Sequence, residues 1–197
     1  MKNIDKNEPD LFRNYLKKNH PQSWRILSKA IGYDIRSYML TEEQNCQCAY
    51  TEIYLSPGNS HVDHFRKQNL FPNLIFEWNN LFTSCNSDCY GARFKDSKIK
   101  REDYKYVINP AEDDTQNYFS YSITGEILAE ENNEQAEITI ALFNLNDYAL
   151  VEQRKAAAQM VMAMRKQCTL DELVEYIGKF ESFIRAIYTD FKNIEYH

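Results

Sequence analysis

The sequence predicts an α+β fold, with a small loop-rich core flanked by N-terminal and C-terminal helices and accompanied by a short β-hairpin. Three observations favour it. Apolar residues recur at helical spacing near both ends of the chain. Residues 45–105 contain four of the five cysteines together with His61 and His64. Beyond them, residues rich in Tyr, Ile and Val surround Thr124-Gly125. We therefore divide the chain into an N-terminal helical segment, a core, and a hairpin with C-terminal helices: residues 1–44, 45–105 and 106–197.

The first segment is expected to form two or three short helices. From Pro9 to Leu40 the apolar residues form stripes at helical spacing. Pro21 and Gly32 interrupt these stripes. Proline and glycine are the residues least compatible with a helix interior, so we place breaks at both positions.

The third segment is expected to begin with strands. Tyr104–Ile108 and Tyr118–Leu128 are rich in Tyr, Ile and Val, the residue types that favour a pleated surface. The dipeptide Thr124-Gly125 between apolar runs indicates a turn. These features predict short strands and one hairpin.

From Asp147 onward the spacing becomes helical again. Thr169 followed by Glu172 is a capping box, which predicts one helix whose apolar face runs from Leu170 to Phe191. Residues 156–164 are apolar around most of a helix and rich in Met. Such a helix is either enclosed in its own fold or docked against a partner.

The charge distribution leaves room for nucleic-acid binding despite a net charge of -6. Residues 106–197 carry sixteen acidic and seven basic side chains, which makes this region a poor phosphate binder. The stretch 91–101 instead carries five basic side chains against Asp96 alone. It is either a phosphate-facing patch or an ordinary solvated surface.

The chain is expected to be cytoplasmic and bacterial, with no membrane contact. Its first ten residues are polar and charged, unlike a secretory signal, and no run of about 18 apolar residues occurs. The cysteine number is odd, which argues against a disulfide framework. Two close cysteine pairs would suit tetrahedral zinc, although buried cysteines also serve as small apolar groups.

The segment His61–Phe65 alternates its side chains as a strand does, with His61, Asp63 and Phe65 on one face and His64 on the other. Twist at the end of the strand would still let Asp63 and His64 meet at one phosphate. The carboxylate is a hard ligand for Mg²⁺, and the imidazole is a base that titrates near neutral pH. Taken alone, an Asp-His pair in a strand is more often structural than catalytic.

A series of motifs in one order makes the pattern more specific. The motifs are Cys48–Glu52, Val62–Arg66, Glu77–Leu81, Ser84–Cys89 and Arg93–Asp96. The series resembles the HNH endonucleases that serve as effector subunits of Septu and retron anti-phage systems, the PtuB-like proteins. The resemblance covers most of residues 24–155. It implies a ββα-metal fold for the core.

The resemblance also implies roles for individual residues. His64 would deprotonate the attacking water, Asp63 would bind Mg²⁺ or Mn²⁺, and Asn80 would orient the imidazole through backbone contacts. Arg93 or Lys95 would hold a phosphate oxygen. Further nucleic-acid contacts are expected from His61, Arg66 and Lys98, and His61 is alternatively an additional ligand or a satisfied polar neighbour.

The sequence departs from the family pattern in its cysteine pairs and at one metal-ligand position. Thr51 stands where relatives have a second cysteine, and the later pair is widened to Cys85-x-x-x-Cys89. A structural zinc would therefore need Cys46, Cys48, Cys85 and Cys89. Tyr90 stands where relatives place an Asn or His ligand. Asp88, the carboxylate nearest that position, is our candidate for the missing metal ligand, with Asp96 as the alternative.

The expected function is metal-dependent phosphodiester hydrolysis in DNA or RNA, tRNA included. The main alternative is an HNH-derived adaptor that binds nucleic acid and an ATPase without cutting. A Cys/His hydrolase is disfavoured, because no cysteine is marked as a nucleophile near His64. The resemblance implies an ABC- or SMC-type ATPase partner and, in retron systems, a reverse transcriptase with its RNA-DNA product. The acidic C-terminal helices, with Met160, Met162 and Met164, are expected to dock that partner.

Overall fold

The computed structural model describes the backbone of residues 1–195 and the side chains of residues 1–190. The helices within this range are α1 (Asp10–Asn19), α2 (Lys29–Tyr38), α3 (Ala92–Lys98), α4 (Glu134–Phe143), α5 (Tyr148–Met164), α6 (Leu170–Ile177) and α7 (Glu181–Glu195). The strands are β1 (Ser60–His64), β2 (Leu81–Cys85), β3 (Phe119–Tyr121) and β4 (Ile127–Ala129). The fold is thus α+β, as predicted, and mostly helical.

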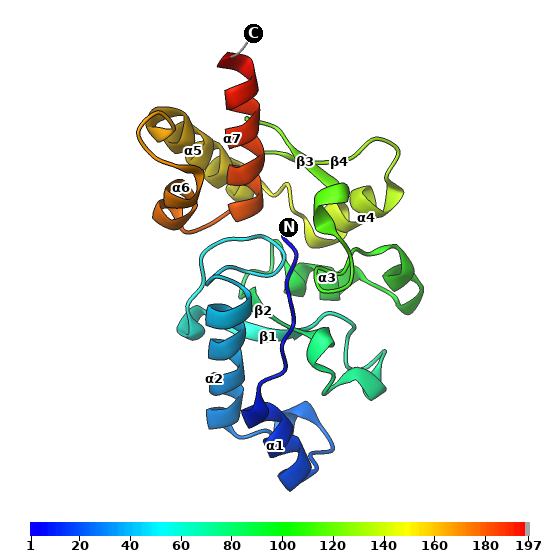
Figure 1. Ribbon diagram of the computed structural model, residues 1–197. Coiled ribbons are helices and arrows are strands. Elements are labelled where there is room, and N and C mark those ends of the chain that lie inside the picture. The colour runs from blue at the N-terminus through cyan, green and yellow to red at the C-terminus, as the bar shows by residue number, and fades with distance from the viewer. Residues whose placement is uncertain (196–197) are drawn as a thin grey trace.

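The strands form two small antiparallel sheets, β1 with β2 and β3 with β4. Figure 1 shows α1 and α2 at one end of the molecule, β1 and β2 in the middle, and α5 to α7 at the other end. The N-terminus lies between these two ends, where the Met1 ammonium pairs with Glu52 at 2.7 Å. None of the helices in residues 1–195 is both long and apolar enough to cross a membrane.

Three clusters of buried apolar side chains hold these parts together. The N-terminal cluster includes Phe12, Ile35, Met39, Trp78 and Leu81. The central cluster includes Leu40, Tyr50, Phe65, Phe82, Ile108, Phe119 and Phe143. The C-terminal cluster includes Ala157, Val161, Leu173, Phe183 and Ile187. The central cluster draws on all three segments of the chain, so the helices at both ends are anchored to the sheet that carries the site.

The predicted helix break at Gly32 is wrong, because α2 continues through it. The helix begins at Ser28, whose hydroxyl accepts a hydrogen bond from the backbone N–H of Ile31 at 3.3 Å. Ile31 and Ile35 are buried on one face. Burying two isoleucines outweighs the cost of about 1 kcal/mol for one glycine in a helix.

The strand predicted at Tyr104–Ile108 is also wrong. Residues Arg101–Tyr106 form a 3₁₀ helix, in which Asp103 accepts a hydrogen bond from the backbone N–H of Lys100 at 2.8 Å. The backbone N–H of Ile108 donates to the Thr139 hydroxyl at 3.0 Å rather than to a strand. The apolar residues of this segment pack into the central cluster. Packing there does not require the segment to pair with a strand.

The hairpin of β3 and β4 confirms the turn predicted at Thr124-Gly125. Gly125 has φ +100, and a Cβ built there would lie 2.3 Å from the carbonyl oxygen of Val151. Arg154, which is buried, donates to the Gly125 carbonyl at 2.5 Å and to the Leu145 carbonyl at 2.6 Å. Glycine is therefore required here by both backbone conformation and close packing against α5.

Gly125→Ala is expected to lower the free energy of unfolding by about 2–4 kcal/mol, because it combines an unfavourable φ with a steric clash. Urea denaturation measures the change. Gly32→Ala is the matched control, because a Cβ at Gly32 would meet nothing within 4 Å. The control should leave stability unchanged or raise it by up to about 1 kcal/mol. Equal behaviour of the two variants would contradict this account of the hairpin.

The capping box at Thr169 and Glu172 is confirmed, but the predicted single helix is two. Helix α6 ends at Gly178, which has φ +66. The backbone N–H of Phe180 then donates to the Glu52 carbonyl at 2.8 Å, and that of Ser182 to the Glu52 carboxylate at 2.7 Å. The break allows α7 to begin on the central part of the molecule. Phe191, assigned to the same apolar face, lies outside the described side chains.

Candidate active site

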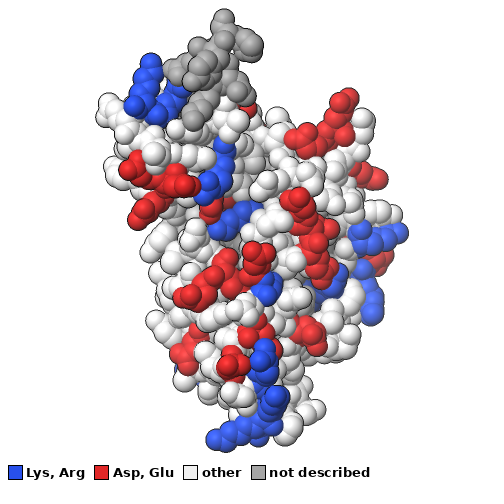
Figure 2. All heavy atoms as spheres, viewed as in Figure 1, with Lys and Arg blue, Asp and Glu red and all other residues white. Residues whose placement is uncertain are grey.

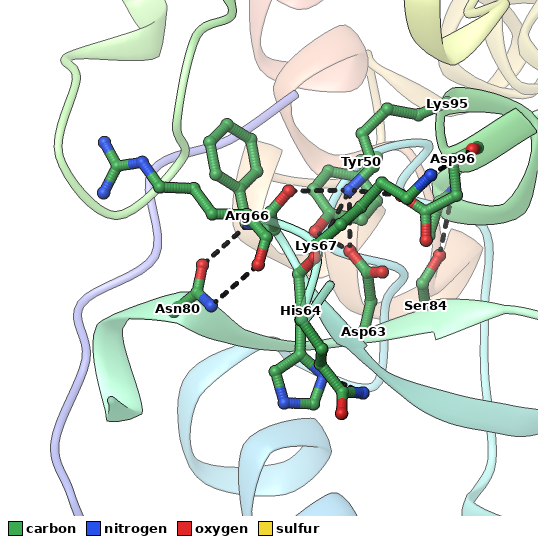
Figure 3. A network of polar contacts seen from close by, with 12 residues as sticks. Tyr50, Asp63, His64, Arg66, Lys67, Asn80, Ser84, Lys95 and Asp96 are labelled. Carbon is green, nitrogen blue, oxygen red and sulfur yellow. Dashed lines mark hydrogen bonds and ion pairs between the residues drawn. The ribbon is translucent and has the colours of Figure 1, made fainter. Parts of the chain in front are cut away.

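The candidate site lies at the end of β1, where the strand carries Asp63 and His64. The register of the sheet pairs Asp63 with Phe82 and His64 with Leu81. The two side chains leave the strand in different directions, as Figure 3 shows and as strand alternation requires. Both nevertheless line one open cleft of about 670 Å³, together with His61, Lys67, Gln68, Arg93 and Asp96.

The position of His64 fixes the roles of its two ring nitrogens. Its Nε2 lies 3.0 Å from the Ile75 carbonyl oxygen. Because a carbonyl only accepts, Nε2 carries the hydrogen, and Nδ1 is left with a lone pair. The Gln68 amide nitrogen lies 3.2 Å from Nδ1. Burial lowers the pKa of His64, which keeps the imidazole neutral at neutral pH.

Asp63 is held from the inside of the molecule through one oxygen. The Tyr50 hydroxyl donates to Oδ2 at 2.5 Å, and the Lys95 ammonium lies 3.4 Å from the same oxygen. Figure 3 shows both partners on the side away from the His64 ring. No hydrogen bond from the described side chains reaches Oδ1. That oxygen is therefore the part of Asp63 available to the cleft.

Lys95 is buried at the centre of this network and is not a surface contact. Its ammonium donates to the Phe65 carbonyl at 2.8 Å and lies 3.1 Å from Asp96 Oδ1. It also lies over the rings of Tyr50 and Phe143 at 5.9 and 5.8 Å from their centroids. The side chain is 0% exposed. The expectation that Lys95 contacts nucleic acid is thus wrong, because α3 directs it inward toward the end of β1.

Asn80 braces the loop that follows β1. Its Oδ1 accepts a hydrogen bond from the backbone N–H of Arg66 at 2.7 Å, and its Nδ2 donates to the Arg66 carbonyl at 3.1 Å (Figure 3). Nδ2 also donates to the Leu74 carbonyl at 3.1 Å. The loop residue Ile75 is the one that holds His64 Nε2. Asn80 therefore stabilises the backbone on both sides of the imidazole without touching it.

Cationic and amide groups complete the rim of the cleft. Arg93 donates to the carbonyl and to the side-chain oxygen of Asn86, both at 3.1 Å. The same side-chain oxygen lies 3.1 Å from His61 Nδ1. Asn86 thus joins His61 to Arg93 across the end of the sheet. The exposed Arg25, from the loop before α2, lines the cleft from another direction.

Three other predicted residues are not brought to the cleft. Arg66 turns to Glu112 at 3.1 Å, and Lys98 lies over the Phe94 ring at 3.8 Å. Asp88 has a side chain that is 84% exposed and is paired with Arg93 at 3.4 Å. Asp96, which lies within α3, lines the cleft instead. The helix and not the loop before it therefore supplies the second carboxylate.

The four cysteines proposed for zinc are not gathered into one donor set. Cys48 and Cys85 are both buried, and Cys48 Sγ lies 3.5 Å from the Ser84 hydroxyl. Cys46 is half-buried and Cys89 is exposed. No three His, Cys, Asp or Glu side chains in the described part of the chain are arranged to hold a metal. The Cys48–Cys85 pair packs as part of the central cluster.

A magnesium ion needs fewer protein ligands than a structural zinc, and the cleft contains two carboxylates. Asp96 Oδ1 is buried and accepts no hydrogen bond, and its close contact is the Lys95 ammonium. Asp63 Oδ1 accepts no hydrogen bond from the described side chains. Magnesium in phosphoryl-transfer sites is held by one or two carboxylates, with water and substrate phosphate as the other ligands. Asp63 and Asp96 are therefore the residues of the cleft that could hold Mg²⁺ or Mn²⁺.

Several of these residues carried no signal in the sequence. Tyr50 is separated from Asp63 by a turn and most of a strand, and nothing in its neighbourhood marks it as a partner of the carboxylate. Gln68 and Asn86 are polar residues in loops, where such residues are common.

No protein-family model matches the chain. The chain is similar to the Septu protein PtuB of Bacillus thuringiensis, with 27% identity over 152 residues. The matched stretch is 75% of this chain and 53% of the relative, so the chain spans about half the length of the curated relative it matches. This distant similarity supports the Septu-like relationship that the order of the motifs indicated.

Proposed function

We propose that this chain is the nuclease component of a bacterial anti-phage defence system and that it hydrolyses phosphodiester bonds in DNA or RNA. The similarity to a Septu protein supports a role in defence. The order of β1, β2 and α3 around the cleft supports an HNH-type core. The observation that carries the chemistry is a histidine whose Nε2 is fixed by a carbonyl, beside a carboxylate, in an open polar cleft.

In this proposal the chain's own residues divide the work. His64 Nδ1 accepts a proton from the attacking water, which replaces the Gln68 amide as its partner, because the hydrogen on Nε2 is held by the Ile75 carbonyl. Asp63 and Asp96 would hold a divalent ion, which would stabilise negative charge on the phosphate and the leaving oxygen. Arg93 and Lys67 line the cleft, where their cations attract the nucleic-acid backbone. Asn80 holds in place, through hydrogen bonds to the backbone, the loop that positions the imidazole.

The surface is consistent with a local and not a global attraction for nucleic acid. Figure 2 shows acidic and basic side chains interspersed over one face, with basic side chains gathered at the end that carries α1. No broad basic stripe covers the face in view. Recognition is therefore expected to depend on the cleft and on a partner, which leaves both DNA and RNA as substrates.

Cleavage is expected to require a divalent cation. Incubating the purified complex with plasmid, single-stranded DNA and total tRNA should give cleavage of at least one substrate with Mg²⁺ or Mn²⁺, and EDTA should stop it. Asp63→Asn should reduce the cleavage, and the matched control Asp88→Asn should not, because Asp88 faces solvent. Cleavage that persists in EDTA would point to another mechanism.

The adaptor alternative is favoured by one specific contact. The Lys95 ammonium already lies between the two carboxylates and offsets part of their charge. A protein that binds nucleic acid without cutting would need no further cation there. Binding of an oligonucleotide by the purified complex, with every substrate left intact in Mg²⁺ and in Mn²⁺, would favour the adaptor.

The partner is proposed to dock on α5, as an ABC- or SMC-type ATPase would in the systems that the motifs resemble. Met160 and Met162 are 37% and 54% exposed on this helix. Ala157, Ala158 and Val161 face the C-terminal cluster. The helix is therefore not enclosed in its own fold. Met164 packs partly against the same cluster, so it belongs to the fold and not to the docking face.

Replacing Met160 and Met162 together with Glu is expected to weaken binding of the ATPase at least about tenfold, because it places charge in an apolar contact. Pull-down from co-expressed components and titration with the purified ATPase measure the effect. Leu11→Glu is the control, since Leu11 is 40% exposed on α1 at the opposite end. Equal binding by both variants would exclude α5 as the docking surface.

A further inference from the structure

Lys95 places a fixed positive charge inside the proposed metal site. Its ammonium lies 3.4 Å from Asp63 Oδ2 and 3.1 Å from Asp96 Oδ1. It also contacts the carbonyl oxygens of Phe65 at 2.8 Å and His64 at 3.5 Å. Its nearest polar neighbours are thus all oxygens, and the side chain has no exposure to solvent. Carboxylate and carbonyl oxygens are also the usual ligands of a bound metal cation.

An ammonium in that position opposes the binding of a second cation. The two carboxylates would attract a divalent ion strongly if they were unpaired, because each carries a full negative charge in a partly buried site. Lys95 cancels one of these charges and repels the incoming ion at short range. Water screens this repulsion poorly, since the ammonium is enclosed by Tyr50, Phe65 and Phe143.

We infer that Lys95 acts as an internal cation that sets a low affinity of the Asp63 and Asp96 site for divalent metal. The inference rests on the proposed function and concerns how the same site is regulated. Lys95 is a positioning residue in this role, because it acts on the ion through the carboxylates. If Lys95 served only to stabilise the fold, its loss would disorder Asp63 and weaken metal binding. The proposed role predicts the opposite, which is tighter metal binding.

The test is a Mn²⁺ titration followed by electron paramagnetic resonance, which measures binding without any cleavage. Lys95→Met removes the charge and keeps most of the side-chain volume, so it should tighten Mn²⁺ binding about tenfold or more. Lys95→Arg keeps the charge and should bind Mn²⁺ like the wild type. Tyr50→Phe removes the neutral hydroxyl contact to Asp63 Oδ2 but leaves the ammonium in place, so it should change Mn²⁺ binding less than Lys95→Met does.

Circular dichroism and melting temperature establish that each variant is folded. If Lys95→Met does not fold, the wild-type protein provides the second measurement. With ¹³C-labelled lysine, Mg²⁺ should shift the ε-carbon signal of Lys95 in parallel with metal binding, and the signal of the exposed Lys98 should stay unchanged.

The outcomes distinguish the proposed role of Lys95 from the proposed nuclease activity. Mn²⁺ binding that is unchanged or weaker in folded Lys95→Met would overturn the role of Lys95 and leave the nuclease proposal standing. A Lys95 signal that does not respond to bound Mg²⁺ would do the same. No Mn²⁺ binding by the wild type or by any folded variant would overturn both.

Discussion

Replacing His64 with Ala is expected to reduce cleavage by about 100- to 10,000-fold, the usual contribution of a positioned general base. The effect follows from the hydrogen bond to the Ile75 carbonyl, which leaves Nδ1 as the acceptor. The rate of product formation by the purified complex measures it. Substrate binding should persist, because the cationic residues of the cleft are retained.

The same substitution also tests whether His64 is structural. The residue is 5% exposed, and its ring meets the edge of the Trp24 ring with centroids 4.7 Å apart. Some loss of stability is therefore expected, and the melting temperature must be measured alongside the rate. His20→Ala is the control, because His20 is exposed after α1. Wild-type cleavage by a folded His64→Ala protein would remove His64 from the mechanism.

Replacing Glu43 with Gln is expected to lower the free energy of unfolding by about 3–5 kcal/mol, because it leaves the Lys6 ammonium buried without its counter-ion. The Lys6–Glu43 pair has a separation of 2.5 Å, and its side chains are 3% and 2% exposed. Glu43 also accepts hydrogen bonds from Trp78 Nε1 at 2.7 Å and from the backbone N–H of Asn7 at 2.8 Å. Burial lowers the pKa of Lys6, which marks the environment as costly for an unpaired charge.

Chemical denaturation monitored by tryptophan fluorescence measures this change, since Trp78 contacts the pair. The matched control is Glu8→Gln. Glu8 pairs with Arg13 at 2.9 Å, but the side chains are 28% and 46% exposed, so the loss should be at most about 1 kcal/mol. Losses of equal size in the two variants would show that burial does not govern the strength of the Lys6–Glu43 pair.

The sequence predicted the elements whose signals are local. The strand at His61–His64, the turn at Thr124-Gly125 and the capping box at Thr169 each depend on a few neighbouring residues, and each appears in the structure. Phe65, predicted to share the strand, lies just beyond its end. Tertiary contacts decided the elements that were predicted wrongly. Residues 104–108 have strand-like composition, yet they form a 3₁₀ turn and fill a core.

In the candidate site, too, local motifs were predictable from the sequence and tertiary contacts were not. Asp63, His64 and Arg93 were identified from their motifs, and the structure places all three at one cleft. The partners that hold them come from distant parts of the chain, as Tyr50 does for Asp63. The basic stretch 91–101 and the family resemblance predict that Lys95 contacts phosphate, whereas the structure buries it. Its direction depends on how α3 packs against β1, which no local pattern encodes.

The most direct test of the central claim is a crystal structure of His64→Ala with its partner, a short oligonucleotide and Mn²⁺. The account predicts an anomalous peak for manganese beside Asp63 and Asp96, with a backbone phosphate next to it in the cleft lined by Arg93 and Lys67. A nucleic acid bound on another face, with no metal at the two carboxylates, would contradict the assignment of this cleft as the site of phosphodiester hydrolysis.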